Sequence, residues 1–265
     1  MNIKSKRFIR NNFWKVVPSP VRGQLANVFV KGLPESERFR LGLPYVMGML
    51  ENLKKNGFAP QTVIDVGANV GDWSRMTSHV FPSAQFFMIE GNPDNEPFLR
   101  NSASMFGQNS EYSILLLGPE EKDSVTFYKL GTGSSVLREL TTFDRSQVTL
   151  PMRTLDRFME SRRYNSPVLL KLDVQGFELQ VLLGGTSTLS RAEVVIMETS
   201  LLPYNENAPL FAEVVAFMAD RGFVAFDFCG QTRRQTDDTL FQTDVVFVKK
   251  DSSLRAPRRF WWGEP

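Results

Sequence analysis

The sequence predicts an α/β fold in which helices cover both faces of a doubly wound, mostly parallel sheet. Three observations predict it. Apolar runs of strand length alternate with helical patterns after about residue 34. Most of these runs, such as "VLLKLD" and "VVIME", are almost continuously apolar, which is typical of strands buried on both faces. A turn with two glycines, "DVGANVG", follows the first run, at the end of the strand where such sheets bind ligands.

The expected elements follow from these patterns. Strands are expected at residues 62–66, 85–90, 112–117, 168–173, 193–198, 223–228 and 243–249. Helices are expected at residues 34–55, 72–80, 93–105, 176–183 and 210–221. The first helix begins at Pro34, a good first-turn residue, and ends before Asn56-Gly57. No helical pattern separates the last two strands, so a hairpin-like connection there would make the final strand antiparallel.

The strand–helix alternation breaks in an insertion at about residues 118–166. Two stretches in it, "SVTFYKL" and "QVTLPM", predict extra strands, and "GTGSSVL" between them predicts a loop. Insertions of this size at a strand's end often shape a ligand site. We therefore expect the "GTGSSV" loop to lie near the site and to contact the acceptor.

The net charge of +2 is unevenly distributed. Residues 1–31 carry +7 with no acidic residue, and residues 249–265 carry +3, which leaves −8 for the residues between them. We expect a basic N-terminal arm and helical cap at 1–56, the ligand-binding domain at 57–250, and a basic tail at 251–265. An acidic body is not typical of a nucleic-acid-binding protein, so no nucleic-acid partner is expected.

The basic arm has two interpretations. Apolar residues are interleaved with its charges, which is typical of an interfacial anchor that contacts a membrane peripherally. The alternative is an arm that folds over the acidic body. The other signals indicate a soluble, cytoplasmic protein. Cys229 is the single cysteine, Lys15 interrupts the apolar stretch near the start, and "LGLPYVMGML" covers about half of a bilayer span.

The turn after the first strand contains Asp65, Gly67, Asn69 and Gly71. Glycine at this place permits a positive φ and a close approach of the backbone to a ligand, and the helix that follows offers free N–H groups. The dinucleotide fingerprint would need glycines at positions 69 and 72, where this chain has Asn69 and Asp72. A nicotinamide cofactor is therefore disfavoured, and no Walker-type phosphate loop is present in the sequence.

Two carboxylates change the preferred ligand. Asp65, just before the first glycine, suits an ammonium group or hydroxyls better than a phosphate. Glu90 ends the second strand in "MIEGNP", where a carboxylate can accept both hydroxyls of a ribose. S-adenosylmethionine has an ammonium, a carboxylate and a ribose but no phosphate, so the pattern predicts it as the cofactor. The alternative is a plain strand–helix–strand unit with a glycine turn and a surface glutamate.

The fourth strand ends at Asp173 in "LLKLDVQGFELQVLLGG". The first and fourth strands of such a sheet flank its ligand crevice, so Asp173 is expected to face the cofactor or the acceptor and to act as the catalytic base. It is also a candidate cap for the helix that begins near Gly176. Lys171 is expected on the same face of the strand, Glu178 is expected to point outward, and Glu198 is the second candidate base.

Six stretches together resemble a known family: "VIDVGANVGDWS", "MIEGNP", "MRTLDRFM", "LLKLDVQGFELQVLLGG", "VVIMETS" and "DVVFV". In order and spacing, over residues 58–249, they are similar to the FkbM-type S-adenosylmethionine-dependent methyltransferases. The resemblance implies a class I methyltransferase (Rossmann-like) fold with seven main strands in the order 3-2-1-4-5-7-6 and the last strand antiparallel. It also implies methyl transfer to a hydroxyl of a sugar, a glycan or glycolipid, or a polyketide-like product.

The resemblance assigns site residues by motif match. The methionine side of the cofactor goes to Asp65, Gly67, Ala68, Asn69 and Gly71, the ribose to Glu90 and Gly91, and the adenine to Leu116 and Leu117. Asp173 matches the family residue at the end of the fourth strand. Gln175 stands where members of the family commonly have a glutamate. No clustered metal ligands are present, so no metal is expected, and His79, the only histidine, is expected to point away.

Two other function classes stay open. One is a non-catalytic module that keeps the fold and binds a partner. The other is methyl transfer to nitrogen. Enzymes that methylate amino groups have an "NPPY"-type tetrapeptide after the fourth strand, and this chain has "DVQG" there, which argues against that function.

Overall fold

The computed structural model describes residues 45–106, 109–140, 145–234 and 236–256. The chain divides into two units, Met1–Val46 and Met47–Pro265. Three expectations lie outside the described residues: the anchor role of residues 1–31, the helix start at Pro34, and the end of the basic tail.

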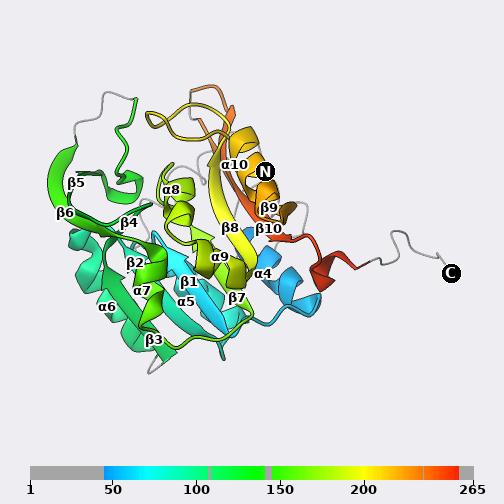
Figure 1. Ribbon diagram of the computed structural model, residues 1–265. Helices are drawn as coiled ribbons and strands as arrows, with labels where there is room; N and C mark the ends of the chain where they lie inside the picture. Colours follow the sequence, from blue (N-terminus) through cyan, green and yellow to red (C-terminus); the bar gives the residue numbers. More distant parts are fainter. Residues whose placement is uncertain (1–44, 107–108, 141–144, 235, 257–265) are drawn as a thin grey trace, which may run out of the picture. The chain divides into compact units, whose positions relative to one another are not determined.

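The larger unit is built on a seven-stranded sheet with the order β3-β2-β1-β7-β8-β10-β9 (Figure 1). Its strands are β1 Thr62–Val66, β2 Gln85–Glu90, β3 Ser110–Ile114, β7 Val168–Leu172, β8 Ala192–Ser200, β9 Phe223–Arg233 and β10 Leu240–Lys249. β10 pairs antiparallel with β8 and β9, whereas the pairs among β3, β2, β1, β7 and β8 are parallel. This topology confirms the class I methyltransferase fold and the antiparallel last strand.

Helices cover both faces of this sheet. They are α4 Tyr45–Lys55, α5 Asp72–Val80, α6 Glu96–Met105, α7 Leu155–Glu160, α8 Glu178–Leu183, α9 Thr186–Arg191 and α10 Phe211–Asp220, with short 3-10 turns η1 Pro93–Asn95 and η4 Ser253–Arg255. The helix expected at 72–80 is confirmed at both ends. The six-residue helices α7 and α9 were not predicted. Among the described helices, none has the length and apolar character needed to cross a membrane.

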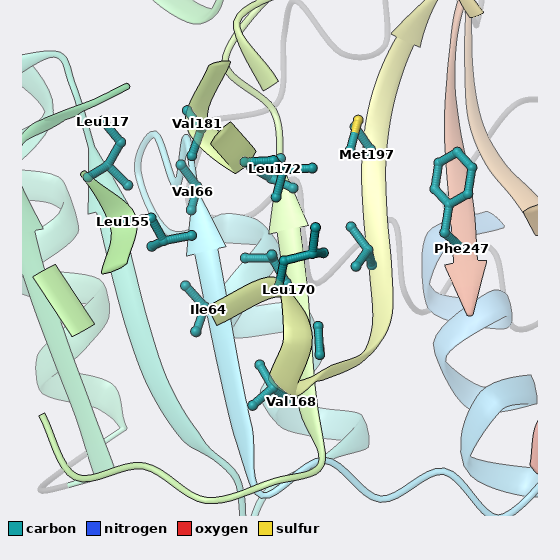
Figure 2. Close-up of a cluster of buried hydrophobic side chains, with 14 of the residues drawn as sticks. Ile64, Val66, Leu117, Leu155, Val168, Leu170, Leu172, Val181, Met197 and Phe247 are labelled. Carbon is teal, nitrogen blue, oxygen red and sulfur yellow. The ribbon is translucent and has the colours of Figure 1, made fainter. Parts of the chain in front are cut away.

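The hydrophobic core packs against both faces of the central strands and holds them in position. Alternate residues of β1 and β7, such as Ile64 and Leu170, pack under Leu155 of α7 and Val181 of α8 (Figure 2). On the opposite face, Met88 of β2 packs with residues of α6. Because both faces of the central strands are buried, polar side chains that face a ligand can emerge only where these strands end.

A second, three-stranded sheet combines two strands of the insertion with a short strand just before it. Its order is β4-β6-β5, with β4 Leu116–Leu117, β5 Lys122–Lys129 and β6 Ser146–Arg153 (Figure 1). The two extra strands are therefore confirmed. The expectation of one strand over 112–117 was wrong in its second half, because Leu116 and Leu117 leave the main sheet and pair with Met152 and Arg153.

Candidate active site

The turn after β1 has the backbone shape that its sequence predicts. Gly67 has φ 77°, Asn69 has φ 50° and Gly71 has φ 84°, all in the left-handed region. At Gly67 a Cβ atom would lie 1.9 Å from the carbonyl oxygen of Asp173, so only glycine fits between β1 and β7 at this point. The turn therefore holds the ends of these two strands close together.

Glu90 is held in place by the backbone of two neighbouring turns. Its Oε2 atom accepts the Asn69 N–H at 2.7 Å and its Oε1 atom accepts the Asn92 N–H at 2.7 Å. The residue is 7% exposed, and burial raises the pKa of its carboxyl while the two backbone N–H groups act in the opposite direction. Each oxygen keeps a second lone pair, so the fixed carboxylate can still accept two hydroxyl hydrogen bonds.

A cavity of about 540 Å³ lies at the carboxyl ends of the parallel strands. Gly67, Asn69, Glu90, Gly91 and Asp173 line it. Leu116 and Leu117 of β4 contribute an apolar part of the wall, and the chain from Leu130 to Val136, between β5 and β6, closes another side. The "GTGSSV" loop therefore lies beside the cavity, as expected.

Three of the predicted cofactor residues do not reach the cavity. Ala68 and Gly71 shape the turn from behind: the N–H of Ala68 donates to the carbonyl of Ile89 on β2, and Gly71 packs against Ser102. Asp65 is fully buried, and its Oδ2 atom accepts a hydrogen bond from Ser74 Oγ at 2.7 Å. These residues support the wall instead of forming it, and a direct cofactor contact for them stays a prediction.

The ammonium group near Asp65 belongs to the chain itself. Lys171 Nζ lies 3.4 Å from Asp65 Oδ1 and 3.2 Å from Asp173 Oδ2, and it donates to the carbonyl of Gly67 at 3.2 Å. Burial disfavours its charge, but the carboxylates of Asp173 and Asp65 outweigh burial and raise the pKa of Lys171. Lys171 and Asp173 share a face of the chain, as the alternation predicts.

The helix after β7 begins differently from the prediction. Glu178 is 3% exposed and not outward-pointing, and its Oε1 atom accepts the N–H groups of Val174 and Gly176 at 2.8 and 3.1 Å. The expected outward direction of Glu178 was therefore wrong. The alternative role of Asp173 as the helix cap is also wrong, because α8 has no side-chain cap and Glu178 satisfies the turn.

Glu198 on β8 lies in the cavity wall beside Asp173. The carboxamide of Gln175 connects the two, since its Nε2 atom donates to Asp173 Oδ1 at 3.1 Å and to Glu198 Oε2 at 2.9 Å. Gln242 Nε2 donates to the same Glu198 oxygen at 3.0 Å. Burial and then neighbouring carboxylates raise the pKa of Glu198 well above its ordinary value.

The sequence did not point to several other wall residues. They come from loops and from edges of the two sheets: Phe127, Phe177, Tyr204, Thr232 and Gln242. No sequence motif marks them, because only the fold brings β5, β9 and β10 to one cavity. His79 and Cys229 are not among the lining residues, and Cys229 is buried as expected. Among the described residues, no group of three or more potential metal ligands is placed to hold a metal ion.

The cavity suits S-adenosylmethionine in size and chemistry. Its volume lies in the range of sites for drug-sized ligands. One end offers the fixed carboxylate of Glu90 for hydroxyls beside the apolar side chains of Ile89, Leu116 and Leu117. The wall at Gly67 lacks a side chain, which leaves the backbone open to a close ligand.

Comparisons with known proteins agree with this architecture. The model of the methyltransferase FkbM domain family matches residues 65–225. Over 236 residues the chain is 25% identical to the hexuronic acid methyltransferase AglP of Haloferax volcanii, covering 82% of this chain and 88% of that protein.

Solved structures with similar folds include other methyltransferases. One is precorrin-6y C5,15-methyltransferase from Geobacter metallireducens, with 14% identity, 78% and 88% of the two chains covered, and a TM-score of 0.45. Another is magnesium protoporphyrin IX methyltransferase from Synechocystis with bound S-adenosylmethionine, with 12% identity, 94% and 98% covered, and a TM-score of 0.44. The family match spans more than half of the sequence, so this chain belongs to the FkbM methyltransferase family and is an S-adenosylmethionine-dependent methyltransferase.

Proposed function

We propose that the protein methylates a hydroxyl group of a sugar, a glycan or glycolipid, or a polyketide-like product. The observation that carries this proposal is the pairing of two carboxylates, Asp173 and Glu198, in the same cavity as Glu90. An aliphatic hydroxyl is too weakly acidic to ionise before it attacks, so a nearby base must take its proton during the transfer. A carboxylate beside the cofactor supplies that base.

A sugar is the acceptor class with the most support. The relative AglP is named for its action on a hexuronic acid, and the described wall of this cavity is rich in groups that accept hydrogen bonds from hydroxyls. Its described lining residues include three carboxylates, Glu90, Asp173 and Glu198, and no lysine or arginine. Such a wall favours the hydroxyls of a sugar and opposes a further carboxylate, so a neutral sugar fits better than a uronate.

The residues that line the cavity support the following proposed roles. We assign the ribose hydroxyls to Glu90, the adenine to Leu116 and Leu117, and the methionine side to the turn at Gly67 and Asn69. When bound, S-adenosylmethionine supplies an electrophilic methyl group on a sulfonium, and the sulfur keeps the bonding electron pair as a neutral thioether. The protein holds the acceptor oxygen in line with that methyl group and receives its proton.

Label transfer tests the proposal. The protein is incubated with trideuteromethyl-labelled S-adenosylmethionine and with glycan and lipid extracts of host cells, and products are found by mass spectrometry. The wild-type protein should label a hydroxyl-bearing compound, and Glu90→Ala should label far less of it at a low cofactor concentration. Label that appears on an amine, or on no component of either extract, would contradict hydroxyl methylation.

A further inference from the structure

The two carboxylates of the acceptor end differ in how their oxygens are occupied. Both oxygens of Asp173 are engaged, Oδ2 by the ammonium of Lys171 at 3.2 Å and Oδ1 by the carboxamide of Gln175 at 3.1 Å. In Glu198 both amide hydrogen bonds fall on Oε2. Its other oxygen, Oε1, accepts no hydrogen bond from the described residues. Each oxygen of Asp173 keeps one lone pair, but a donor already lowers its basicity, whereas Glu198 Oε1 keeps both lone pairs free of donors among the described residues and is the better acceptor for a proton.

The side chain of Glu198 is also well fixed. Gln242, which is buried, donates to it from the antiparallel neighbour β10. Gln175 donates to it from a turn whose own backbone is held, since the carbonyl of Gln175 accepts Asn205 Nδ2 at 2.6 Å and Ser135 Oγ at 3.0 Å. Two donors from different elements define one position for the carboxylate, as a catalytic base requires.

We propose that Glu198, and not Asp173, takes the proton of the acceptor hydroxyl, and that Gln175 and Gln242 position it. This inference rests on the proposed methylation of a hydroxyl. As the new O–C bond forms, the acceptor's O–H bond breaks and its proton passes to Glu198 Oε1. The negative charge of the carboxylate and the positive charge of the sulfonium disappear together, so the step needs no further reactant.

The surroundings of Glu198 suit this role. Titratable and charged groups face it from the neighbouring strands, from α8 and from the segment after β8: Lys171, Asp173, Glu178, Tyr204 and Asp244. Asp244 is directly opposite Glu198 in the β8–β10 register. Burial comes first and the acidic neighbours second in raising the pKa of Glu198, with Lys171 acting against them. A carboxyl group with a raised pKa is a stronger base at neutral pH than an ordinary one.

The central test compares Glu198→Gln with Asp173→Asn. Initial rates at saturating S-adenosylmethionine are measured from about pH 5 to about pH 9, with the extract that accepts label from the wild-type protein as the acceptor pool. Glu198→Gln should lower the rate by ~10²–10⁴-fold and remove the acid limb of the wild-type profile. Asp173→Asn should lower the rate by a smaller factor. It should also move the acid limb to lower pH, because removal of a negative neighbour lowers the pKa of Glu198.

Two controls separate chemistry from folding. Both variants should bind S-adenosylhomocysteine within about threefold of the wild-type affinity by calorimetry, since neither change is assigned to the ribose. Glu193→Gln, at the opposite end of the same strand, should match the wild-type protein in rate and profile. Glu198→Asp, which keeps a carboxylate but withdraws it, should recover part of the rate that Glu198→Gln loses.

A third variant tests the positioning residues. Gln242→Met keeps the volume but removes one donor to the charged form of Glu198, so the acid limb should move to higher pH and the plateau rate should fall. A side chain that only supports packing would lower the rate without moving the limb.

The outcomes distinguish this inference from the proposed function. If the wild-type protein labels no hydroxyl, both fail together. If it does, and Glu198→Gln keeps the rate within about fourfold while Asp173→Asn loses ~10²-fold or more, Asp173 is the base and the inference about Glu198 is overturned. Methylation of a hydroxyl would stand in that case.

Discussion

Lys171 Nζ lies 3.4 Å from Asp65 Oδ1, behind the cavity wall and not within it. Asp65 was expected to suit an ammonium group or hydroxyls of the cofactor; in the structure its partner is the ammonium group of Lys171 on the neighbouring strand β7, and a direct cofactor contact stays a prediction. The pair supports the turn at Gly67, because Lys171 also donates to the carbonyl of that glycine. The contacts that Asp65 makes in the structure therefore support the turn at Gly67.

Lys171→Met should strongly destabilise the protein. Asp65 is fully buried, and removal of its cationic partner leaves an uncompensated charge. Breaking a buried pair in this way typically costs about 3–5 kcal/mol of unfolding free energy. Arg75→Ala, which removes the exposed pair of Arg75 with Asp72, should cost ~1 kcal/mol or less. Denaturant unfolding of both variants checks this, and equal losses would show that the buried pair does not support the fold.

Gly67→Ala should disturb both stability and cofactor binding. Gly222 is a matched control, since it also has a positive φ, 81° against 77°, but a Cβ atom there would have no atom of the described residues within 4 Å. Gly222→Ala should therefore cost only backbone strain, about 1–2 kcal/mol. Gly67→Ala adds a collision with the backbone of Asp173 and should cost about 1–3 kcal/mol more. It should also weaken binding of S-adenosylhomocysteine, and unchanged affinity would mean that this turn does not shape the cofactor site.

Stability should fall as the pH rises towards neutrality, in part because of Glu178. Burial raises the pKa of Glu178 from 4.5 to about 7, so the folded state binds more protons than the unfolded state between these values. Its stabilising contribution is complete below the unfolded pKa and is lost as the pH rises through the folded pKa.

Glu178→Gln keeps the acceptor for the Val174 and Gly176 N–H groups but cannot ionise. The variant should flatten the fall in unfolding free energy by an amount of order 3 kcal/mol across this range. Glu160→Gln, at an exposed position, should keep the wild-type slope. Chemical denaturation at a series of pH values measures both, and a slope that Glu178→Gln leaves unchanged would contradict the assignment.

Glu90→Ala should weaken cofactor binding. The change removes a charged acceptor of ribose hydroxyls and leaves the N–H groups of Asn69 and Asn92 without their partner. We expect a loss of about 1.5–3 kcal/mol in the binding of S-adenosylhomocysteine by calorimetry. Wild-type binding should persist in EDTA, because no metal is assigned to the site. Glu120→Ala, an exposed change, serves as control, and equal affinities for the two variants would remove Glu90 from the ribose site.

The sequence predicted the main sheet well because its strands are buried on both faces. Continuous apolar runs gave β1 and β2 with their observed ends. The same signal failed at Leu116 and Leu117, since an apolar run does not reveal that the chain changes sheets in the middle of it. The short helices α7 and α9 were missed although α8, also six residues long, was expected; α8 is an apolar-rich stretch after Gly176, whereas six residues of mostly polar sequence in α9 and of mixed sequence in α7 show no helical period.

The site residues that belong to one local motif could be predicted from the sequence. Those that come together from distant segments could not. The glycine turn and Glu90 are local features, and they do lie together at the cavity. The direction of Glu178 depends on where α8 begins, two residues later than expected, with its side chain folded back on the preceding turn. The contacts of Gln175 and Gln242 with Glu198 join three segments that no local pattern connects.

The central claim is that this family member transfers methyl groups to a hydroxyl. The most direct measurement uses S-adenosylmethionine labelled with ¹³C in its methyl group, followed by two-dimensional carbon–proton NMR of the purified product. The predicted result is a labelled methyl group correlated through oxygen with a ring or chain carbon of the acceptor, formed by the wild-type protein and nearly absent with Glu198→Gln. A labelled methyl group on nitrogen, or one whose formation is independent of the protein, would contradict the claim.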